Sequence, residues 1–264
     1  MSTTQVSAAH LADWMLAHGR SSATTKEIAQ ILDIPPDQVR QRLHVPSRRN
    51  EWVSPARGLW VPVPAQYRLW GAPEGIEIVN ALMGHLAVNY YVGWLSAAEL
   101  YGAAHQAPQV FQVATNRFVS NRQVGRTQFA FQTRSATPQV PTVQYQTHSG
   151  TAIVSAREAT MLDIASDLTL VGGIDNAATV IIELAEDGYN PDTFAAAAAL
   201  HSAAAIRRVG WFLEKLADTE VQAIHNLTAG FTTDPSLLDP TGPTRGTIDR
   251  RWQIRVNRDI EEES

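Results

Sequence analysis

Two consecutive prolines, Pro35 and Pro36, constrain the N-terminal part of this chain more than any other feature. A short helix is expected to begin near Thr24, because Thr24 and Glu27 have the spacing of a reciprocal capping pair. That helix must end before Pro35, since proline lacks a backbone N–H and clashes with the preceding turn. Pro36 fits the first position of a new helix, where the missing N–H costs nothing. The pattern therefore predicts two helices joined by a tight turn.

The second helix of this pair, expected over residues 36–43, carries long polar side chains on its outer face. Val39 and Leu43 have the spacing of a buried face. The other side chains are hydrogen-bond donors and acceptors of the kind that reach base edges and phosphates from a helix in the major groove of DNA. The candidate DNA-contacting residues on this helix are Gln38, Arg40, Gln41 and Arg42.

A β-hairpin is predicted directly after these helices. Strand-like runs at 51–54 and 59–63 flank a turn at 55–58 that contains proline and glycine. Arg57 is carried to the hairpin tip, where it can hold a phosphate or enter a minor groove. Arg48 and Arg49, in the loop before the hairpin, are further candidate phosphate contacts. Together these elements predict a winged helix-turn-helix DNA-binding domain over residues 1–65.

The distribution of charge supports a nucleic-acid partner for the N-terminal part. The whole chain has a net charge of −5. Residues 1–70, however, hold 8 Lys and Arg against 5 Asp and Glu, whereas the remainder holds 13 against 21. Between Arg40 and Arg57 there are five arginines and one acid. This local basic face, which the total hides, favours binding to double-stranded DNA.

The composition also excludes several kinds of site. The chain has no cysteine, which rules out disulfides, zinc sites with thiolate ligands and cysteine nucleophiles. No stretch approaches the roughly 20 apolar residues of a membrane span. The N-terminus lacks the basic and then apolar pattern of an export signal. The expectation is a cytoplasmic protein that does not contact a membrane.

Beyond residue 73 the chain is expected to form a second, mixed domain. Residues 66–73, which lie between prolines, form the predicted linker. Residues 74–264 form the predicted second domain, which ends in an acidic tail at 261–263. Strand-like runs rich in Val, Phe, Thr and Gln accompany helical patterns there, which predicts an antiparallel sheet and several helices. The expected fold class is α+β, a winged helix-turn-helix followed by this mixed domain.

Local patterns indicate where the elements of the second domain lie. Ser96 with Glu99, and Ser155 with Glu158, have the spacing of capping pairs and predict two helix starts. Four helices are expected between residues 174 and 227. The strand-like runs are 110–115, 127–133, 143–147, 151–154 and 247–257, the last of which is expected to return to the sheet.

Several segments, in order, resemble the AbiEi family, the antitoxin and repressor half of type IV toxin-antitoxin pairs that act in abortive infection of phage-infected cells. These segments are 93–102, 155–163, 207–214, and 238–240 followed by 251–257. The resemblance implies an operator-binding N-terminal domain that represses the chain's own operon. It also implies a C-terminal domain that counteracts a nucleotidyltransferase-like toxin, by direct or indirect contact. The operator is expected to contain inverted repeats.

A search for enzyme motifs finds no candidate catalytic site. The chain lacks the Gly-Ser turn of nucleotidyltransferases, and its only lysines, Lys26 and Lys215, do not fit a nuclease motif. The eight histidines show no metal-binding spacing, and no phosphate-binding loop or nucleophile elbow is present. Asp163 and Asp167, four residues apart on a helix, are expected on a solvated face. We therefore expect no catalytic residue, metal or cofactor.

The second domain still offers a candidate surface for toxin neutralisation. Its cations are expected to point outward from an otherwise acidic domain, and those singled out are Arg207, Arg208, Lys215, Arg251 and Arg255. The simpler interpretation is that they only face water. Two other functions stay open at this point: an enzyme that acts on nucleotides or nucleic acid, and a ligand-sensing transcriptional regulator without a toxin partner.

Overall fold

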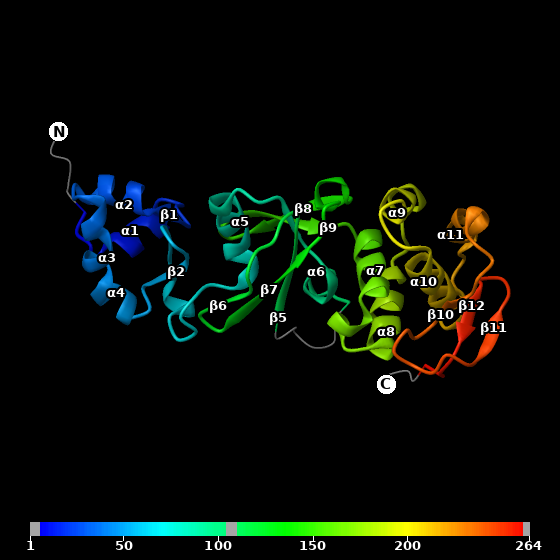
Figure 1. Ribbon diagram of the computed structural model, residues 1–264. Helices are drawn as coiled ribbons and strands as arrows, with labels where there is room; N and C mark the ends of the chain where they lie inside the picture. Colours follow the sequence, from blue (N-terminus) through cyan, green and yellow to red (C-terminus); the bar gives the residue numbers. More distant parts are fainter. Residues whose placement is uncertain (1–5, 104–109, 261–264) are drawn as a thin grey trace. The chain divides into compact units, whose positions relative to one another are not determined.

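The computed structural model describes residues 6–103 and 110–260 (Figure 1), so the expected acidic tail at 261–263 lies outside the described residues. The chain divides into two compact units. The first comprises residues 1–90, 109–135 and 144–153, and the second comprises 91–108, 136–143 and 154–264. The segment expected as a linker, residues 66–73, is part of the first unit. The fold is α+β, as predicted.

The N-terminal part of the first unit consists of short helices and a three-stranded antiparallel sheet (Figure 1). The sheet order is β1-β3-β2, so β2 is an outer strand. The helical elements are α1 (Leu11–Ala17), α2 (Thr25–Leu32), the 3₁₀ turn η1 (Pro36–Gln38), α3 (Val39–Arg42) and α4 (His44–Arg48), and the strands are β1 (Ala23–Thr24), β2 (Trp52–Ala56) and β3 (Leu59–Pro62).

The predicted start of α2 is confirmed. The Thr24 hydroxyl accepts a hydrogen bond from the Glu27 backbone N–H at 3.2 Å, and the Glu27 carboxylate accepts from the Thr24 N–H at 2.7 Å. The helix ends at Asp33, which adopts the left-handed conformation with φ of 52°. Pro36 then begins the next helical segment, as its missing N–H favours.

Two local features differ from the sequence-based expectation. The helical segment after the prolines continues through α3 and α4 to Arg48 rather than ending at residue 43. Pro55 lies within β2 and not in the hairpin turn. The turn itself is Arg57-Gly58, because Ala56 pairs with Leu59 across the hairpin. Gly58 has φ of +86°, a conformation that glycine adopts without steric cost.

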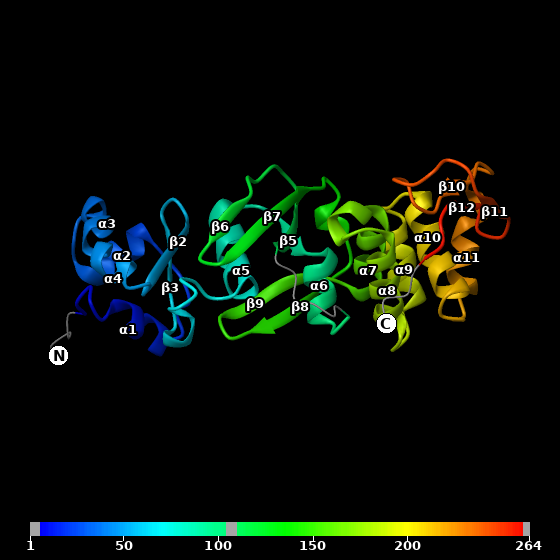
Figure 2. The same cartoon turned by 90° about the horizontal axis from the view of Figure 1, so that it is seen from below.

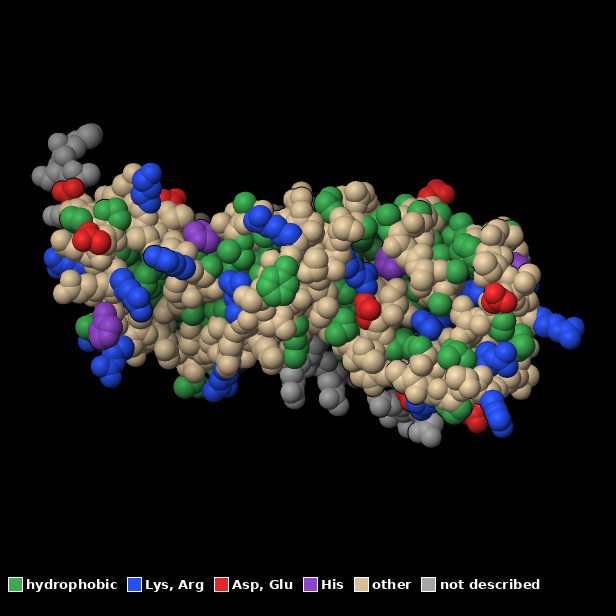
Figure 3. All heavy atoms as spheres, viewed as in Figure 1, with side chains coloured by type: hydrophobic (Ala, Val, Ile, Leu, Met, Phe, Trp, Pro, Cys, Tyr) green, Lys and Arg blue, Asp and Glu red, His purple; other side chains and the backbone are tan. Residues whose placement is uncertain are grey.

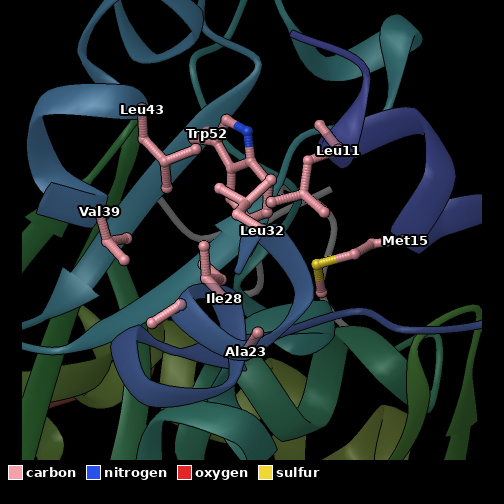
Figure 4. Close-up of a cluster of buried hydrophobic side chains, with 10 residues drawn as sticks. Leu11, Met15, Ala23, Ile28, Leu32, Val39, Leu43 and Trp52 are labelled. Atoms are coloured by element: carbon pink, nitrogen blue, oxygen red, sulfur yellow. The ribbon is translucent and has the colours of Figure 1, made fainter. Parts of the chain in front are cut away.

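One hydrophobic cluster holds these N-terminal elements together. Trp52 from the hairpin lies among Leu11 of α1, Leu32 of α2 and Leu43 (Figure 4). Each of these side chains is at most 7% exposed. Burial of a large apolar side chain contributes roughly 1.5–3 kcal/mol, so this cluster fixes the helices against the hairpin.

The largest sheet has six strands in the order β6-β7-β5-β4-β9-β8, and Figure 2 shows β7 between β6 and β5. It is mixed, which corrects the predicted antiparallel sheet: β5 is parallel to β7, and β4 is parallel to β9. Helix α5 (Gly75–Leu86) belongs to the first unit. The strands are β4 (Tyr90–Val92), β5 (Val110–Thr115), β6 (Arg122–Val124), β7 (Thr127–Thr133), β8 (Thr142–Thr147) and β9 (Gly150–Ser155), and the 3₁₀ turns η2 (Ala65–Tyr67) and η3 (Thr137–Gln139) lie between elements.

The second unit is mainly helical. The four helices expected between residues 174 and 227 are confirmed as α8 to α11. The last strand does not return to the large sheet, because β12 pairs with β10 and β11 in a separate three-stranded sheet. Its elements are α6 (Trp94–Leu100), α7 (Arg157–Ser166), η4 (Leu168–Val171), α8 (Ile174–Ala185), α9 (Pro191–Ala198), α10 (Ala203–Lys215), α11 (Gln222–Leu227), η5 (Thr228–Gly230), β10 (Ser236–Leu237), β11 (Thr247–Asp249) and β12 (Ile254–Val256).

The two capping pairs predicted in this region are wrong. Ser96 lies inside α6, which begins after Gly93. Ser155 ends β9, and its hydroxyl is within hydrogen-bond distance of the Val92 carbonyl and the Thr160 hydroxyl instead of a helix start. No helix among the described residues is long and apolar enough to cross a membrane.

Candidate nucleic-acid interface and antitoxin domain

Five arginines of the N-terminal part are exposed and carry no acidic partner. Within the described part of the chain, no hydrogen bond or ion pair engages their guanidinium groups, whereas Arg20 pairs with Glu27 and Arg68 pairs with Asp13. A cation without a neighbouring carboxylate keeps its full charge available for an external anion. These five residues are Arg40, Arg42, Arg48, Arg49 and Arg57.

A groove of about 740 Å³ lies between the second helical segment, which is the one that follows the two prolines and runs from Pro36 to Arg48, and the β2–β3 hairpin. Arg40, His44 and Ser47 line it from the helical side. Ser54 and Arg57 line it from the hairpin. The groove therefore has a cation on each side, Arg40 and Arg57, and guanidinium groups are donors suited to phosphate oxygens.

The structure separates the predicted DNA-contacting residues into groups. Arg40 and Arg57 line the same groove, but Arg42 lines a different hollow beside Asp33. Gln41 is exposed on α3, whereas Gln38 in η1 is half-buried. Arg48 and Arg49 are exposed at the end of α4 and line neither hollow.

The sequence analysis missed two residues of the groove, His44 and Ser47. They follow Arg40 at the i+4 and i+7 positions of one helical face. The signal was present in the sequence, but the helix was expected to end at residue 43. Since the helix continues to Arg48, the polar face is one turn longer than predicted.

The two compact units differ in the sign of their charge. The first unit holds 12 Lys and Arg against 7 Asp and Glu, and the second holds 9 against 19. Residues 109–135 of the first unit contribute four arginines and no acid. Lys and Arg side chains gather over the N-terminal helices on the face in Figure 3. The first unit therefore has the net charge that attracts a polyanion.

Arg207 and Arg208 do not form the expected outward-facing stripe, and that prediction is wrong. They are 2% and 6% exposed. Arg207 donates to the carbonyls of Thr232 at 2.5 Å and Asp234 at 2.9 Å. Its guanidinium also lies over the Phe231 ring. Burial lowers the pKa of both arginines. Arg207 therefore ties α10 to the segment that precedes β10.

Arg208 has a similar structural role on the same helix. Its Nε donates to the Leu238 carbonyl at 2.9 Å, and its Nη1 donates to the Ala165 carbonyl at 2.9 Å. A further hydrogen bond runs from Nη2 to the Leu237 carbonyl at 3.1 Å. One guanidinium thus joins α10, the end of α7 and the segment after β10.

The other three candidate cations of the second unit are engaged near its surface. Lys215 lies 2.9 Å from Glu214, and Arg251 lies 2.6 Å from the same carboxylate. Burial raises the pKa of Glu214, but hydrogen bonds from Lys215 and Trp252 and the nearby positive charges leave it below its usual value. Arg255 is half-buried and donates to the Gly246 carbonyl at 3.3 Å. Only Lys215 and Arg251 of the five predicted residues are exposed.

Asp163 is fully buried, contrary to the expectation of a solvated face. Its Oδ1 accepts a hydrogen bond from the Tyr91 hydroxyl at 3.2 Å and lies 3.1 Å from His201 Nε2. The carboxylate therefore joins β4, α7 and the segment that follows α9 inside the second unit. Across the described residues, no group of three or more His, Asp and Glu side chains is arranged to hold a metal ion.

This combination of N-terminal helices and hairpin, mixed sheet and helical second unit is similar to the fold in the crystal structure of the RV2827C protein from Mycobacterium tuberculosis. The similarity covers 94% of this chain and 90% of that chain, with a TM-score of 0.68 and 13% sequence identity. At that identity the likeness concerns the fold alone. No curated protein matches the chain in sequence.

Residues 91–215 match the family of the AbiEi antitoxin C-terminal domain. These residues form a domain of the AbiEi antitoxin family, which confirms the resemblance predicted from the sequence. The match contains three of the segments that carried the resemblance, 93–102, 155–163 and 207–214. Two of them supply Asp163 and Arg208; the partners of Asp163 lie inside the matched domain, whereas Arg208 also joins it to Leu237 and Leu238 beyond its end.

Proposed function

We propose that this protein is a DNA-binding antitoxin that represses its own toxin-antitoxin operon and counteracts a nucleotidyltransferase-like toxin. In this proposal, residues 1–65 are a winged helix-turn-helix domain that binds operator DNA. Residues 74–264 are the antitoxin domain, and residues 66–73 connect the two. The observation that carries the DNA-binding role is the groove between the second helical segment and the hairpin, which has an arginine without an acidic partner on either side.

The groove and the exposed face of α3 have different roles in this proposal. Arg40 and Arg57 hold the phosphate backbone, because two cations across a groove match two negative oxygens along one strand. Gln41 and Arg42 contact base edges, since a glutamine pairs with adenine and an arginine with guanine in the major groove. Arg48 and Arg49 contribute additional phosphate contacts at the end of α4.

The DNA-binding role can be tested with the region upstream of the protein's own gene. Arg57→Ala should lower the slope of log K against log salt by about 1, because one phosphate contact is lost. Gln41→Ala should cost roughly 1–3 kcal/mol on the operator and leave binding to unrelated DNA unchanged. Arg20→Ala is the matched control, since Arg20 is already paired with Glu27. Equal salt slopes for the wild type and Arg57→Ala would contradict the phosphate assignment.

The antitoxin role can be tested by co-expression with the toxin. The double variant Arg40→Ala, Arg57→Ala should lose repression of the promoter but still rescue growth, because the AbiEi domain lies at residues 91–215. Loss of rescue in a variant with an unchanged melting transition would show that neutralisation works through the DNA-binding groove. Turnover of nucleotides or cleavage of DNA by the purified wild type would favour an enzyme instead.

A further inference from the structure

The outer strand of the N-terminal sheet is held by side chains from elsewhere in the first unit. Strand β2 lies at the end of the order β1-β3-β2, so its outer side has no neighbouring strand in that sheet. Arg122 of β6 donates from Nη1 to the Pro55 carbonyl at 3.1 Å. His85, in the last turn of α5, is 3.0 Å from the Arg57 carbonyl through its Nε2. Two distant parts of the sequence therefore meet the hairpin beside its tip.

Arg122 is itself fixed in place. Its Nε and Nη2 both donate to the Ser120 carbonyl at 3.3 Å, and its guanidinium stands 5.5 Å from the centre of the Phe131 ring. None of the described carboxylates forms an ion pair with it. Partial burial of a cation without an acidic partner has a desolvation cost. The contact with Pro55 is thus made by a guanidinium that its hydrogen bonds to Ser120 and its contact with the Phe131 ring hold in place.

His85 contacts the backbone of the turn itself. A carbonyl oxygen only accepts, so His85 Nε2 must carry the proton of this hydrogen bond. A Cβ at Gly58 would lie 3.8 Å from His85 Cε1, which places the ring against the turn backbone. The hydrogen bond involves only the backbone carbonyl of Arg57, and the side chain of Arg57 is exposed.

We propose that Arg122 and His85 are positioning residues. They fix the β2–β3 hairpin so that Arg57 faces the candidate DNA-binding groove of the protein. This inference rests on the proposed DNA-binding function. A hairpin tip that is already ordered loses less conformational freedom when DNA binds, so its contacts retain more of their affinity. Residues far beyond the winged helix thereby control how strongly Arg57 acts on the operator.

The test compares Arg122→Ala, Arg57→Ala and the double variant of the full chain. Arg122→Ala should weaken operator binding about tenfold, the effect of losing one hydrogen bond from a charged group. In the Arg57→Ala background, the same change should have less than about a twofold effect, because Arg122 acts through Arg57. His85→Gln, which retains a donor, should bind more tightly than His85→Ala.

A second measurement does not depend on DNA. Hydrogen exchange of residues 52–62 in the free protein should become faster in Arg122→Ala, since the strand loses a carbonyl partner. Arg126→Ala is the matched control, because Arg126 carries the same charge at the exposed turn between β6 and β7. That variant should leave exchange in the hairpin unchanged.

The outcomes separate the two proposals. Additive effects of Arg122→Ala and Arg57→Ala on affinity, or unchanged exchange over residues 52–62, would overturn the positioning role. If the wild type binds no operator DNA, the proposed function fails, and the exchange of the hairpin alone then decides whether Arg122 holds it.

Discussion

Replacing Arg208 by alanine should strongly destabilise the second compact unit. The guanidinium satisfies the carbonyls of Ala165, Leu237 and Leu238, and the side chain is 6% exposed. Removal leaves three backbone acceptors without their donor in a region that water scarcely reaches. Each buried unsatisfied polar group costs about 1–3 kcal/mol. The relieved desolvation of the cation offsets part of that sum, so we expect a net loss of about 3–5 kcal/mol.

A lysine at position 208 separates the effect of charge from the effect of geometry. Its ammonium keeps the positive charge, but one point group cannot reach three carbonyls that the planar guanidinium contacts together. Arg208→Lys should therefore still lose roughly half of the stability that Arg208→Ala loses. A variant that behaved like the wild type would show that charge alone matters at this position.

Urea unfolding of the full chain, followed by tryptophan fluorescence, measures this loss. The second unit contains Trp211 and Trp252, both buried, whose emission should change at a lower urea concentration in the variant. Lys215→Ala is the matched control, since Lys215 is an exposed cation on the same helix. A loss below about 0.5 kcal/mol, the size expected for a water-facing arginine, would refute the structural role of Arg208.

Two further predictions concern packing and pH. Gly210→Ala should lower the melting temperature by several degrees, because the new methyl group would overlap the Trp252 ring, and overpacking costs about 1–3 kcal/mol; an unchanged melting curve would contradict this packing. Hydrogen bonds from the Thr24 backbone and hydroxyl lower the pKa of Glu27, so its stabilising contribution is complete above its ordinary pKa of 4.5 and disappears as the pH falls through the lower folded value. Glu27→Gln should reduce this acid dependence in pH-dependent melting, and an identical pH profile in the variant would exclude the contribution.

The parts of the fold that the sequence predicted well are those with local causes. The capping pair of Thr24 and Glu27 and the break at Pro35 act within a few residues, so the boundaries of α2 follow from them. The pairs Ser96 with Glu99 and Ser155 with Glu158 have the same spacing but fail as helix caps. At Ser155 the competing acceptor is the Val92 carbonyl, which only the folded sheet brings near.

The parts that the sequence could not predict depend on contacts between distant residues. A periodic pattern places Arg207 and Arg208 on a polar face only if charged side chains always seek water. In the fold, the carbonyls of residues 232–238 need donors, and these arginines supply them. The pairing of β12 with β10 could not be predicted either. Alternation of polar and apolar residues identifies a strand but not the strand with which it pairs.

The sequence identified the arginines of the candidate DNA-binding groove, but it did not predict which of them line the same groove. Arg40 and Arg57 come from different elements and face one groove, whereas Arg42, two residues from Arg40, lines another hollow. The angular separation of neighbouring residues on a helix explains the difference, once the position of the hairpin is known. His44 and Ser47 would have been predicted as groove residues if the helix had been extended by one turn beyond residue 43.

The hydrophobic cluster around Trp52 has a consequence for the order in which the chain acquires structure. All of its side chains belong to the first 60 residues, so their contacts can form while the ribosome is adding residues 61–264. At about 5–20 residues per second, residues 61–264 take roughly 10–40 s to add. Helix α10, in contrast, holds two guanidinium groups that both need acceptors made 25 to 30 positions later in the chain. A chain released before these acceptors are made would therefore have a packed N-terminal part, but Arg207 and Arg208 of its second unit would lack their hydrogen-bond partners.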